Sequence, residues 1–391
     1  MKKMISDSIN KLAGRSRTAM DTIFKKEIVS LTPKIESRGN VLLSYLTKPF
    51  VFALNKSDFS SHTNQWECVQ IAQSWMDKGY SIDVIDWNND HFIPKKNYSV
   101  FIDIHSNMER LAPLMKENCL KILHITGAHW LFQNTAEYSR LLSLQKRKNI
   151  SLIPRRTVEP SKGIEYADCA TVLGNAFTQG TFEYAGKPIY PIHISTNIQF
   201  PFFEDKNFNE IRKNYLWFGG GGLVHKGLDL VLETFAKMPD YHLTICGSIN
   251  QEPDFEKAYY DELYKTPNIK TIGWMNVHSP EFSEVMKNNV ALIYPSCSEG
   301  GGGSVITCLH AGLIPIISYE SSVDISEFGI LLRDSTIEEI KTAIKKISSL
   351  SDSDLKINSK KSWDYARKYH TQEQFKKEYD KFVEIMSSTM R

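Results

Sequence analysis

The chain has 391 residues, of which 41% are hydrophobic and 24% are charged, and its formal net charge is +2. This is the composition of an ordinary globular protein, and a prior of roughly 150 residues per domain predicts two or three domains. The near-balance of charge argues against nucleic acid as a partner. The sequence contains no run of about 18 apolar residues, so no membrane-spanning helix is expected.

Cysteine usage and the character of the N-terminus predict a cytoplasmic protein. No two cysteines form a Cys-x-x-Cys pair, and several lie in apolar segments. The six are Cys68, Cys119, Cys169, Cys246, Cys297 and Cys308. We interpret them as reduced thiols, with neither a disulfide nor a zinc site. The charged N-terminus lacks the apolar core of a signal peptide.

Residues 1–38 form the first expected unit, a basic amphipathic helix. Its basic residues are Lys2, Lys3, Lys11, Arg15, Arg17, Lys25 and Lys26. Its apolar residues recur at helical spacing and include Ile5, Ile9, Leu12, Met20, Ile23 and Phe24. Two interpretations remain open: the helix docks residues 1–27 on an anionic membrane surface, which would make the protein peripheral at the inner face, or it packs on its own domain.

Residues 39–195 alternate between apolar strand patterns and amphipathic helix patterns. The expected strands are 41–46, 81–87, 99–105, 120–126, 169–173 and 189–194, and the expected helices are 64–78, 108–117 and 135–147. Such alternation predicts right-handed βαβ units, and hence a Rossmann-like parallel sheet covered on both faces.

Polar residues follow the expected strands of this first domain. Ligands bind parallel sheets at the C-terminal ends of the strands, so these positions are candidates for binding a ligand. They are His62, His105, His124, Thr126, His129 and Trp130. Of these, His129 is the candidate general base, and Trp130 is the candidate for stacking on the face of a ligand ring. The competing interpretation is that each histidine is only a satisfied polar group.

A linker and a second domain follow. Residues 196–213 break the periodicity and contain Pro201, as an interdomain linker does. Within 214–365 the expected strands are 215–218, 242–246, 269–272, 290–294 and 313–318, and the expected helices are 223–237, 253–265, 280–287, 304–311 and 337–348. Residues 352–386 are expected to be mostly helical, and 366–391 form a C-terminal helix. This region is a second Rossmann-like domain.

Two glycine-rich turns lie between strand and helix in the second domain. The first is Gly219–Gly222, followed by Lys226. The second is Gly300–Gly303, which follows Glu299. Glycines at such a turn let a ligand approach the backbone, and the N-terminus of the next helix offers free N–H groups to an anion. Lys226 adds a positive charge, so both turns predict a phosphate-bearing ligand.

The stretch 294–317 resembles the donor-sugar motif of retaining glycosyltransferases of the GT-B fold, family 4. The matching residues are Pro295, Ser296, Glu299, Gly300, Ala311, Gly312, Pro315 and Ile316. A second match is Lys226–Gly227. The resemblance implies two Rossmann-like domains that face a cleft, with an acceptor site on the first domain and a C-terminal helix that crosses back onto it.

The resemblance also assigns residues to the donor. Glu299 would face the donor sugar, and Lys226 and the turn amides would face the diphosphate. The implied donor-binding residues are Gly220, Gly221, Gly222, Lys226, Gly247, Gly273, Trp274, Ser298, Glu299, Gly300, Gly301, Gly302, Gly303, Ser304 and Thr307. Two positions depart from the family: Gly221 stands where an arginine is usual, and Thr307 stands where a second glutamate holds the ribose.

No metal or cofactor is expected. The only Asp-x-Asp spacing, Asp352-Ser-Asp354, lies at the start of a helix, where capping explains it. We therefore expect Lys226, the turn amides and helix dipoles to stabilise the leaving diphosphate.

Together with this resemblance, which implies retention of configuration, the sequence predicts a metal-independent glycosyltransferase with Glu299, Lys226 and His129 as its catalytic residues. Its partners would be a nucleotide sugar and a glycan or lipid-linked acceptor, in surface polysaccharide synthesis. Two alternatives stay open. One is a catalytically inactive GT-B partner subunit, since two family residues are absent. The other is a nucleotide-binding Rossmann oxidoreductase or epimerase, although Gly219–Gly222 lacks the later glycine of that fingerprint.

Overall fold

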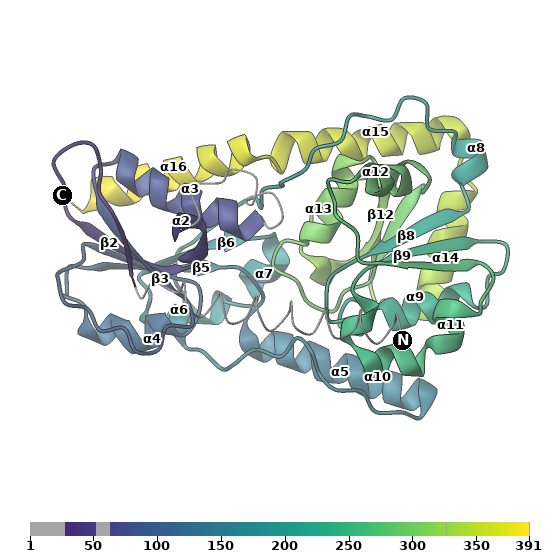
Figure 1. Cartoon of the computed structure of the whole chain (residues 1–391), viewed down its shortest axis with the longest axis horizontal. Helices are drawn as coiled ribbons and strands as arrows, with labels where there is room; N and C mark the ends of the chain where they lie inside the picture. Colours follow the sequence, from purple (N-terminus) through teal and green to yellow (C-terminus); the bar gives the residue numbers. More distant parts are fainter. Residues whose placement is uncertain (1–27, 52–62, 326, 391) are drawn as a thin grey trace, which may run out of the picture.

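Two parallel sheets, each covered by helices on both faces, organise the computed structural model (Figure 1), which describes residues 28–51, 63–325 and 327–390. The first sheet has seven strands in the order β1-β3-β2-β4-β5-β6-β7, and the second has six in the order β10-β9-β8-β11-β12-β13. All described pairings are parallel except that of β1 with β3. The prediction of two Rossmann-like domains is therefore confirmed.

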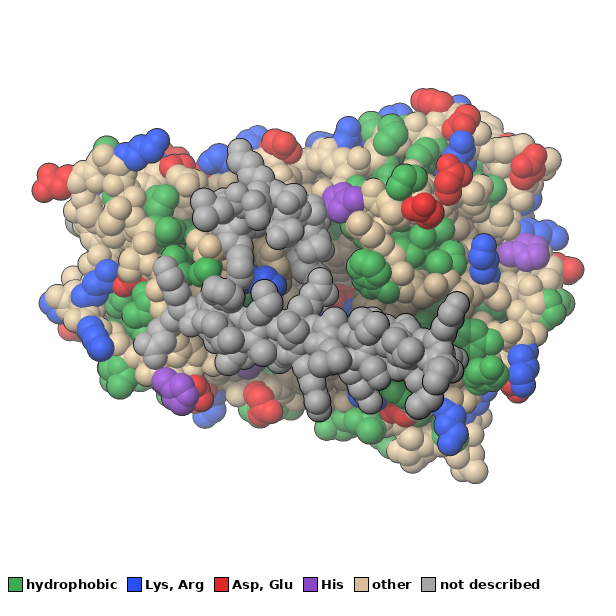
Figure 2. Space-filling view, viewed as in Figure 1, with side chains coloured by type: hydrophobic (Ala, Val, Ile, Leu, Met, Phe, Trp, Pro, Cys, Tyr) green, Lys and Arg blue, Asp and Glu red, His purple; other side chains and the backbone are tan. Residues whose placement is uncertain are grey.

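The surface agrees with the balanced composition. On the face shown in Figure 2, Lys and Arg side chains are interspersed with Asp and Glu side chains over both halves of the molecule. In the described part of the chain, no helix is both long and apolar enough to cross a membrane.

In the first domain, successive side chains of a strand point alternately into two hydrophobic cores, one on each face of the sheet. Its strands are β1 (Val29–Leu31), β2 (Asn40–Tyr45), β3 (Ser81–Asp86), β4 (Val100–Asp103), β5 (Leu120–Ile125), β6 (Cys169–Leu173) and β7 (Ile189–Ile192). Leu43 of β2 packs in the core beneath α3 (Thr63–Asp77). Its neighbour Leu42 packs in the opposite core, with Met108 of α4 (Asn107–Leu111). The strands are therefore apolar at successive positions.

Shorter helices complete this domain. They are α2 (Lys48–Val51), α6 (Gly163–Tyr166), α7 (Ala176–Gly180) and two 3-10 turns, η2 (Ala112–Leu114) and η3 (Glu183–Ala185). The helix expected over 108–117 is instead α4 followed by η2, because Pro113 lacks the N–H that a continued helix needs.

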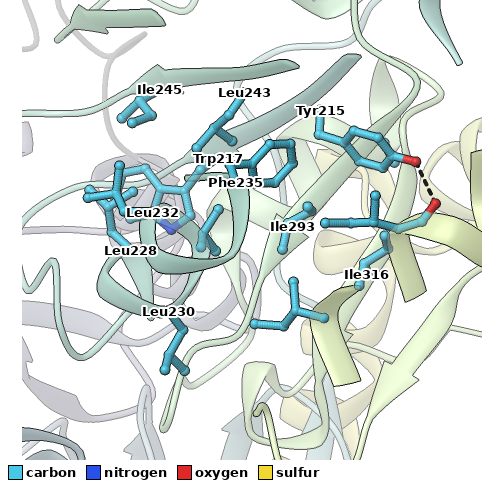
Figure 3. Packing of buried hydrophobic residues seen from close by; sticks show 14 of the residues in the cluster. Tyr215, Trp217, Leu228, Leu230, Leu232, Phe235, Leu243, Ile245, Ile293 and Ile316 are labelled. Carbon is cyan, nitrogen blue, oxygen red and sulfur yellow. Dashed lines mark hydrogen bonds between the residues drawn. The ribbon is translucent and has the colours of Figure 1, made fainter. Parts of the chain in front are cut away.

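In the second domain, too, successive strand side chains point into two cores on opposite faces of the sheet. Its strands are β8 (Asn214–Phe218), β9 (His242–Cys246), β10 (Ile269–Gly273), β11 (Ala291–Tyr294), β12 (Ile314–Ser318) and β13 (Ile330–Leu332). Tyr215, Trp217 and Ile293 point into one core (Figure 3), where the Tyr215 hydroxyl donates a hydrogen bond to the Ile344 carbonyl. Leu216 and Leu292 face the opposite core.

Helices on the second sheet divide between these two cores. The first core takes residues from α9 (Leu228–Phe235), α10 (Pro253–Ala258), α11 (Tyr260–Tyr264) and α14 (Ile337–Ser348). The second takes residues from α12 (Pro280–Lys287), α13 (Gly303–His310) and α15 (Asp352–Tyr369). The remaining elements are α8 (Phe208–Ile211), within the expected linker, and the 3-10 turns η4 (Ile249–Gln251) and η5 (Tyr319–Ser321).

Two of the expected helices here are shorter than the pattern suggested. The helix expected over 223–237 begins only at Leu228, because Gly227 has a positive φ of 71° that no helix continues through. The segment expected as one helix over 253–265 is divided at Tyr259 into α10 and α11.

The C-terminal helix crosses back onto the first domain, as predicted. It is α16 (Gln372–Thr389), separated from α15 by a break at His370 and capped by Thr371, whose hydroxyl accepts the Gln374 N–H. Phe375, Tyr379 and Phe382 of α16 are buried in the core of the first domain. Figure 1 shows the two helices running along one side of both domains.

The N-terminal prediction is corrected in part. Residues 28–38 belong to the segment expected to be helical, but Val29–Leu31 form β1, antiparallel to β3. The backbone N–H and C=O groups of Val29–Leu31 pair with the edge of β3, so this part of the segment is a strand. The basic residues within 1–27 lie outside the described residues, as does His62.

Helix α5 (Trp130–Lys148) joins the two domains. It starts at the end of β5, where the His129 ring accepts the Leu131 N–H, and ends at Asn149 in a left-handed conformation. Its last turns lie against the second domain: Leu144 is fully buried in that domain's core, and Arg147 pairs with Asp229 and Glu233. At 19 residues it reaches about 28 Å, so one helix belongs to both domains.

Candidate functional site

A cavity of about 230 Å³ lies between the two domains. Because the carboxyl ends of parallel strands meet at one edge of each sheet, residues from both domains face it. The first domain contributes His105, Thr126, His129, Trp130 and Arg156, and the second contributes Ser298, Glu299 and Gly300. The cavity thus brings together residues that the sequence assigned separately to an acceptor and to a donor.

Glu299 is the centre of a polar cluster in the cavity wall. Its Oε1 accepts hydrogen bonds from Lys226 Nζ at 2.5 Å, from the Tyr294 hydroxyl at 2.7 Å and from Ser296 Oγ at 2.9 Å. Burial by itself raises the pKa of Glu299, but the charges of Lys226, His225 and Arg156 outweigh it and lower the pKa to about 2. Glu299 is therefore a carboxylate at neutral pH, fixed by three donors.

Its partners come from the ends of neighbouring strands. Tyr294 ends β11, and Lys226 lies in the turn between β8 and α9; β8 and β11 pair directly. Burial, followed by the neighbouring Glu299, raises the pKa of Tyr294 well above its usual value. Tyr294 thus remains a hydrogen-bond donor.

The glycine turn after Glu299 requires glycine. A Cβ on Gly300 would lie 2.1 Å from the Thr126 carbonyl oxygen, which no side chain tolerates. Gly302 has a φ of 56° and stands at the N-cap of α13. Thr307 in that helix donates its hydroxyl hydrogen bond to the Gly303 carbonyl. Close packing of the two domains and the start of α13 therefore both depend on this turn.

The other glycine turn differs from the expectation. The Gly222 N–H donates to Glu252 Oε1 at 2.5 Å, and the Leu223 N–H donates to the same carboxylate at 3.2 Å. A protein carboxylate thus already binds the Gly222 amide, one of the turn amides that we assigned to a phosphate. Gly220 and Gly221 are exposed, and a Cβ on Gly220 would meet open space.

Other expected donor residues lie outside the cavity wall. Gly247 is buried where a Cβ would come within 2.6 Å of the Gly219 carbonyl oxygen, so it permits a close approach of two strand ends. Gly273 ends β10 with a φ of 92°, and the Trp274 that follows is 73% exposed.

The expected acceptor residues divide into two groups. His105 and His129 are half-buried in the cavity wall, and burial lowers the pKa of each. The His129 ring contacts Trp130, Phe182 and Tyr184, and its Nε2 lies 3.3 Å from the Tyr184 hydroxyl. This ring is therefore neutral and held in an aromatic setting.

His124 does not face the cavity, so its assignment to the acceptor site is corrected. It is fully buried, its Nδ1 lies 2.7 Å from Thr171 Oγ1, and its ring contacts Tyr45 and Tyr379. Burial lowers the pKa of His124 to about 4. It shares a strand face with Ile122, which the crossing helix α16 covers.

Sequence reasoning missed a buried network behind Glu299. His225 Nδ1 lies 2.7 Å from Glu137 Oε2 of α5, and His225 Nε2 lies 2.6 Å from the Ser298 carbonyl oxygen. Burial lowers the pKa of His225, but hydrogen bonds with Cys297 and Glu137 outweigh it and raise the pKa to about 9. The pKa of Glu137 would be raised by burial but is held low by His225 and by the Arg155 and Arg156 amides.

Glu137, His225 and Cys297 place a carboxylate, an imidazole and a thiol within 4.8 Å of one another, the one such group found in the described part of the chain. The imidazole faces two acceptors, a carboxylate and a carbonyl, and so carries a proton on each nitrogen. This arrangement is a hydrogen-bonded ion pair, and it leaves the imidazole no lone pair for a metal.

The comparisons with known proteins agree with this geometry. A model of the family described as glycosyl transferases group 1 matches residues 201–363. Sucrose-phosphate synthase from Thermosynechococcus elongatus has a similar structure, with a TM-score of 0.61 and 12% identity over 90% of this chain and 99% of its own. HepE from Anabaena, solved with UDP and glucose, gives a TM-score of 0.55 and 11% identity over 90% and 99%.

A chain of the GtfA/B complex is similar over 73% of this chain, with a TM-score of 0.52 and 16% identity, and the match spans 56% of that chain. No curated protein matches the sequence. At these identities the solved structures establish the fold, and the family model covers the residues in which the sequence predicts the donor-side motif. Residues 201–363 therefore match the family model of the group 1 glycosyl transferases, and the two-domain architecture is the GT-B fold.

Proposed function

We propose that this chain transfers a sugar from a nucleoside-diphosphate sugar to a hydroxyl group of a glycan or lipid-linked acceptor, with retention of the anomeric configuration and without a metal. The observation that carries the proposal is the Lys226–Glu299 ion pair, whose carboxylate lines the cavity together with residues of the first domain. UDP sugars are the first donors to test, because HepE was solved with UDP and glucose.

Each partner of the pair has a separate role. The Glu299 carboxylate accepts hydrogen bonds from hydroxyl groups of the donor sugar. These bonds orient the sugar so that its anomeric carbon faces the acceptor. The Lys226 ammonium offsets the negative charge that grows on the leaving diphosphate as the sugar–phosphate bond breaks. The free amides of Gly303 and Ser304, at the start of α13, add donors for the same phosphates.

The acceptor enters from the first domain. Its hydroxyl forms the new glycosidic bond and gives up its proton, for which the neutral His129 ring is the nearby base. Trp130 and the exposed Tyr184 flank that ring and offer aromatic faces for sugars. The acceptor that we propose is a glycan, in surface polysaccharide synthesis.

The test is a two-stage assay. A thermal-shift screen of nucleotide sugars identifies the donor, and release of the nucleoside diphosphate is then measured with and without an acceptor and in the presence of EDTA. We expect turnover that survives EDTA. Turnover lost in EDTA and restored by magnesium or manganese would refute the metal-independent mechanism.

A second candidate, an inactive partner subunit, is motivated by Gly221 and Thr307. Neither position supplies the family's charged side chain, and the Thr307 hydroxyl is already bonded to its own helix. The same assay separates the two: an inactive subunit would bind the nucleotide sugar without releasing a nucleoside diphosphate.

A further inference from the structure

Every residue of the segment Ser298-Glu299-Gly300 contacts the first domain. Ser298 Oγ donates to Gln133 Oε1 at 3.1 Å, and the Glu299 carbonyl oxygen accepts from Thr178 Oγ1 at 3.3 Å. Gly300 packs on the Thr126 carbonyl. The donor-side carboxylate is therefore positioned by contacts from the acceptor domain as well as from its own.

Two neighbouring residues of the second domain also form hydrogen bonds with this segment. Lys226 binds the Glu299 side chain, and the preceding His225 donates Nε2–H to the Ser298 carbonyl at 2.6 Å. The other nitrogen of His225 donates to Glu137 of α5 at 2.7 Å, and both side chains of this pair are at most 2% exposed. His225 thus bridges helix α5 to the segment that carries Glu299.

From this geometry we infer that His225 and Glu137 are positioning residues for the transfer reaction. The pair holds Glu299 in the position needed for transfer only while α5 of the first domain is packed against the second domain. The inference rests on the proposed function but adds residues that the donor motif does not contain. It makes the acceptor domain part of the donor site.

The charges around the pair agree with this role. Lys226, Arg156 and His225 together surround Glu299 with positive charge. Glu137 supplies the compensating negative charge for His225, and its other oxygen accepts the Arg155 and Arg156 N–H groups at 2.8 Å and 3.3 Å. Removing the Glu137 charge leaves a buried imidazolium without its partner, which favours loss of its proton or movement of the segment.

The test compares Glu137→Gln with a matched control, Glu262→Gln. Glu262 of α11 also pairs with α5, through Lys148, but it does not contact the 298–300 segment. We expect Glu137→Gln to lower kcat at least tenfold with KM for the donor changed less than threefold, and Glu262→Gln to leave both unchanged. Equal losses in both variants would mean that only general docking of α5 matters, and would overturn the inference.

Variants of His225 separate its two contacts. Glutamine at this position extends to the place of Nε2 and can still donate to the Ser298 carbonyl, whereas asparagine reaches only as far as Nδ1. We expect His225→Gln to retain more kcat than His225→Asn. The double variant Glu137→Gln/His225→Asn should be no slower than the worse single variant, because both break one bridge. Multiplicative losses would contradict this.

A protein-only measurement keeps the inference separate from the proposed function. Amide hydrogen exchange over residues 296–303 should be faster in Glu137→Gln than in the wild type and unchanged in Glu262→Gln. If the wild type turns over no nucleotide sugar, the proposed function fails while this comparison still decides the positioning role. Unchanged exchange in Glu137→Gln, or one equivalent of zinc bound to the purified protein and lost in that variant, would overturn it.

Discussion

At the scale of single residues, Glu299 combines a fixed position with a fixed charge. Three donors bind one of its oxygens, and its pKa of about 2 keeps it ionised across the physiological range. In the proposed reaction Glu299 would therefore act as a hydrogen-bond acceptor and a negative charge, and not by giving or taking a proton.

Substitution of Glu299 tests this role directly. Glu299→Gln keeps the shape but removes the charge that balances Lys226. We expect a folded protein whose turnover is at least tenfold lower, equivalent to about 1.4 kcal/mol of transition-state stabilisation. Steady-state kinetics together with a melting curve measure both. Unchanged kinetics would remove Glu299 from the site.

Lys226 is expected to act on phosphate instead of sugar. The Lys226→Ala variant loses the ammonium group, so it should bind the nucleoside diphosphate and the sugar nucleotide more weakly by a similar factor. Calorimetric titration with both ligands checks this. A variant with normal nucleotide affinity and a defect only in acceptor affinity would contradict the assignment.

At the scale of elements, α5 is the helix that connects the two domains. Leu144, on its last turns, is fully buried in the core of the second domain, although the helix starts in the first. The neighbouring Leu142 is 56% exposed on the opposite side of the same helix. The two leucines form a matched pair for testing how strongly α5 is docked.

Truncation of these leucines should have very different costs. For Leu144→Ala we expect a loss of about 2–5 kcal/mol in the free energy of unfolding, because a buried side chain is replaced by a cavity. For Leu142→Ala we expect a change within about 0.5 kcal/mol. Urea unfolding followed by fluorescence measures both. Similar stabilities would show that α5 is not held by the second domain's core.

At the scale of the whole molecule, the crossing elements define the cavity. Helix α5 spans one side of the domain interface and α15–α16 the other, as Figure 1 shows. The cavity between the domains is then lined by residues of both, with His105, His129 and Trp130 from the first domain and Glu299 from the second. In the proposed reaction, donor and acceptor would meet in this cavity because both connections hold the two domains in this arrangement.

Membrane docking also belongs to this scale and remains a prediction for residues 1–27. Each basic residue near an anionic surface contributes about 1 kcal/mol, so five or more would give salt-sensitive binding. Deleting residues 1–27 should release the protein from anionic vesicles and leave turnover of a soluble acceptor intact. Vesicle sedimentation at low and high salt checks the first point. A truncated protein with a much lower melting temperature and unchanged vesicle binding would instead support packing of this segment on its own domain.

The sequence by itself determined the two sheets, most of their strands and the donor-side motif. These features depend on local signals: apolar runs of strand length, glycine and proline at element ends, and the spacing of Glu299 from its glycine turn. The sequence did not predict the antiparallel β1 or the short β13, because a strand of three residues is too short to show a hydrophobic periodicity. The order of residues was enough to place Lys226 and Glu299 at strand ends of one domain.

Only the tertiary structure decided which side chains meet across long separations. His225 and Glu137 are 88 positions apart, and Glu252 is 30 positions from the Gly222 amide that it binds. His124 is buried and not in the cavity because α16, more than 250 residues later, covers its face of the sheet with Tyr379. Both faces of a parallel sheet are apolar, so the pattern of β5 alone cannot tell which polar residue a distant helix will cover.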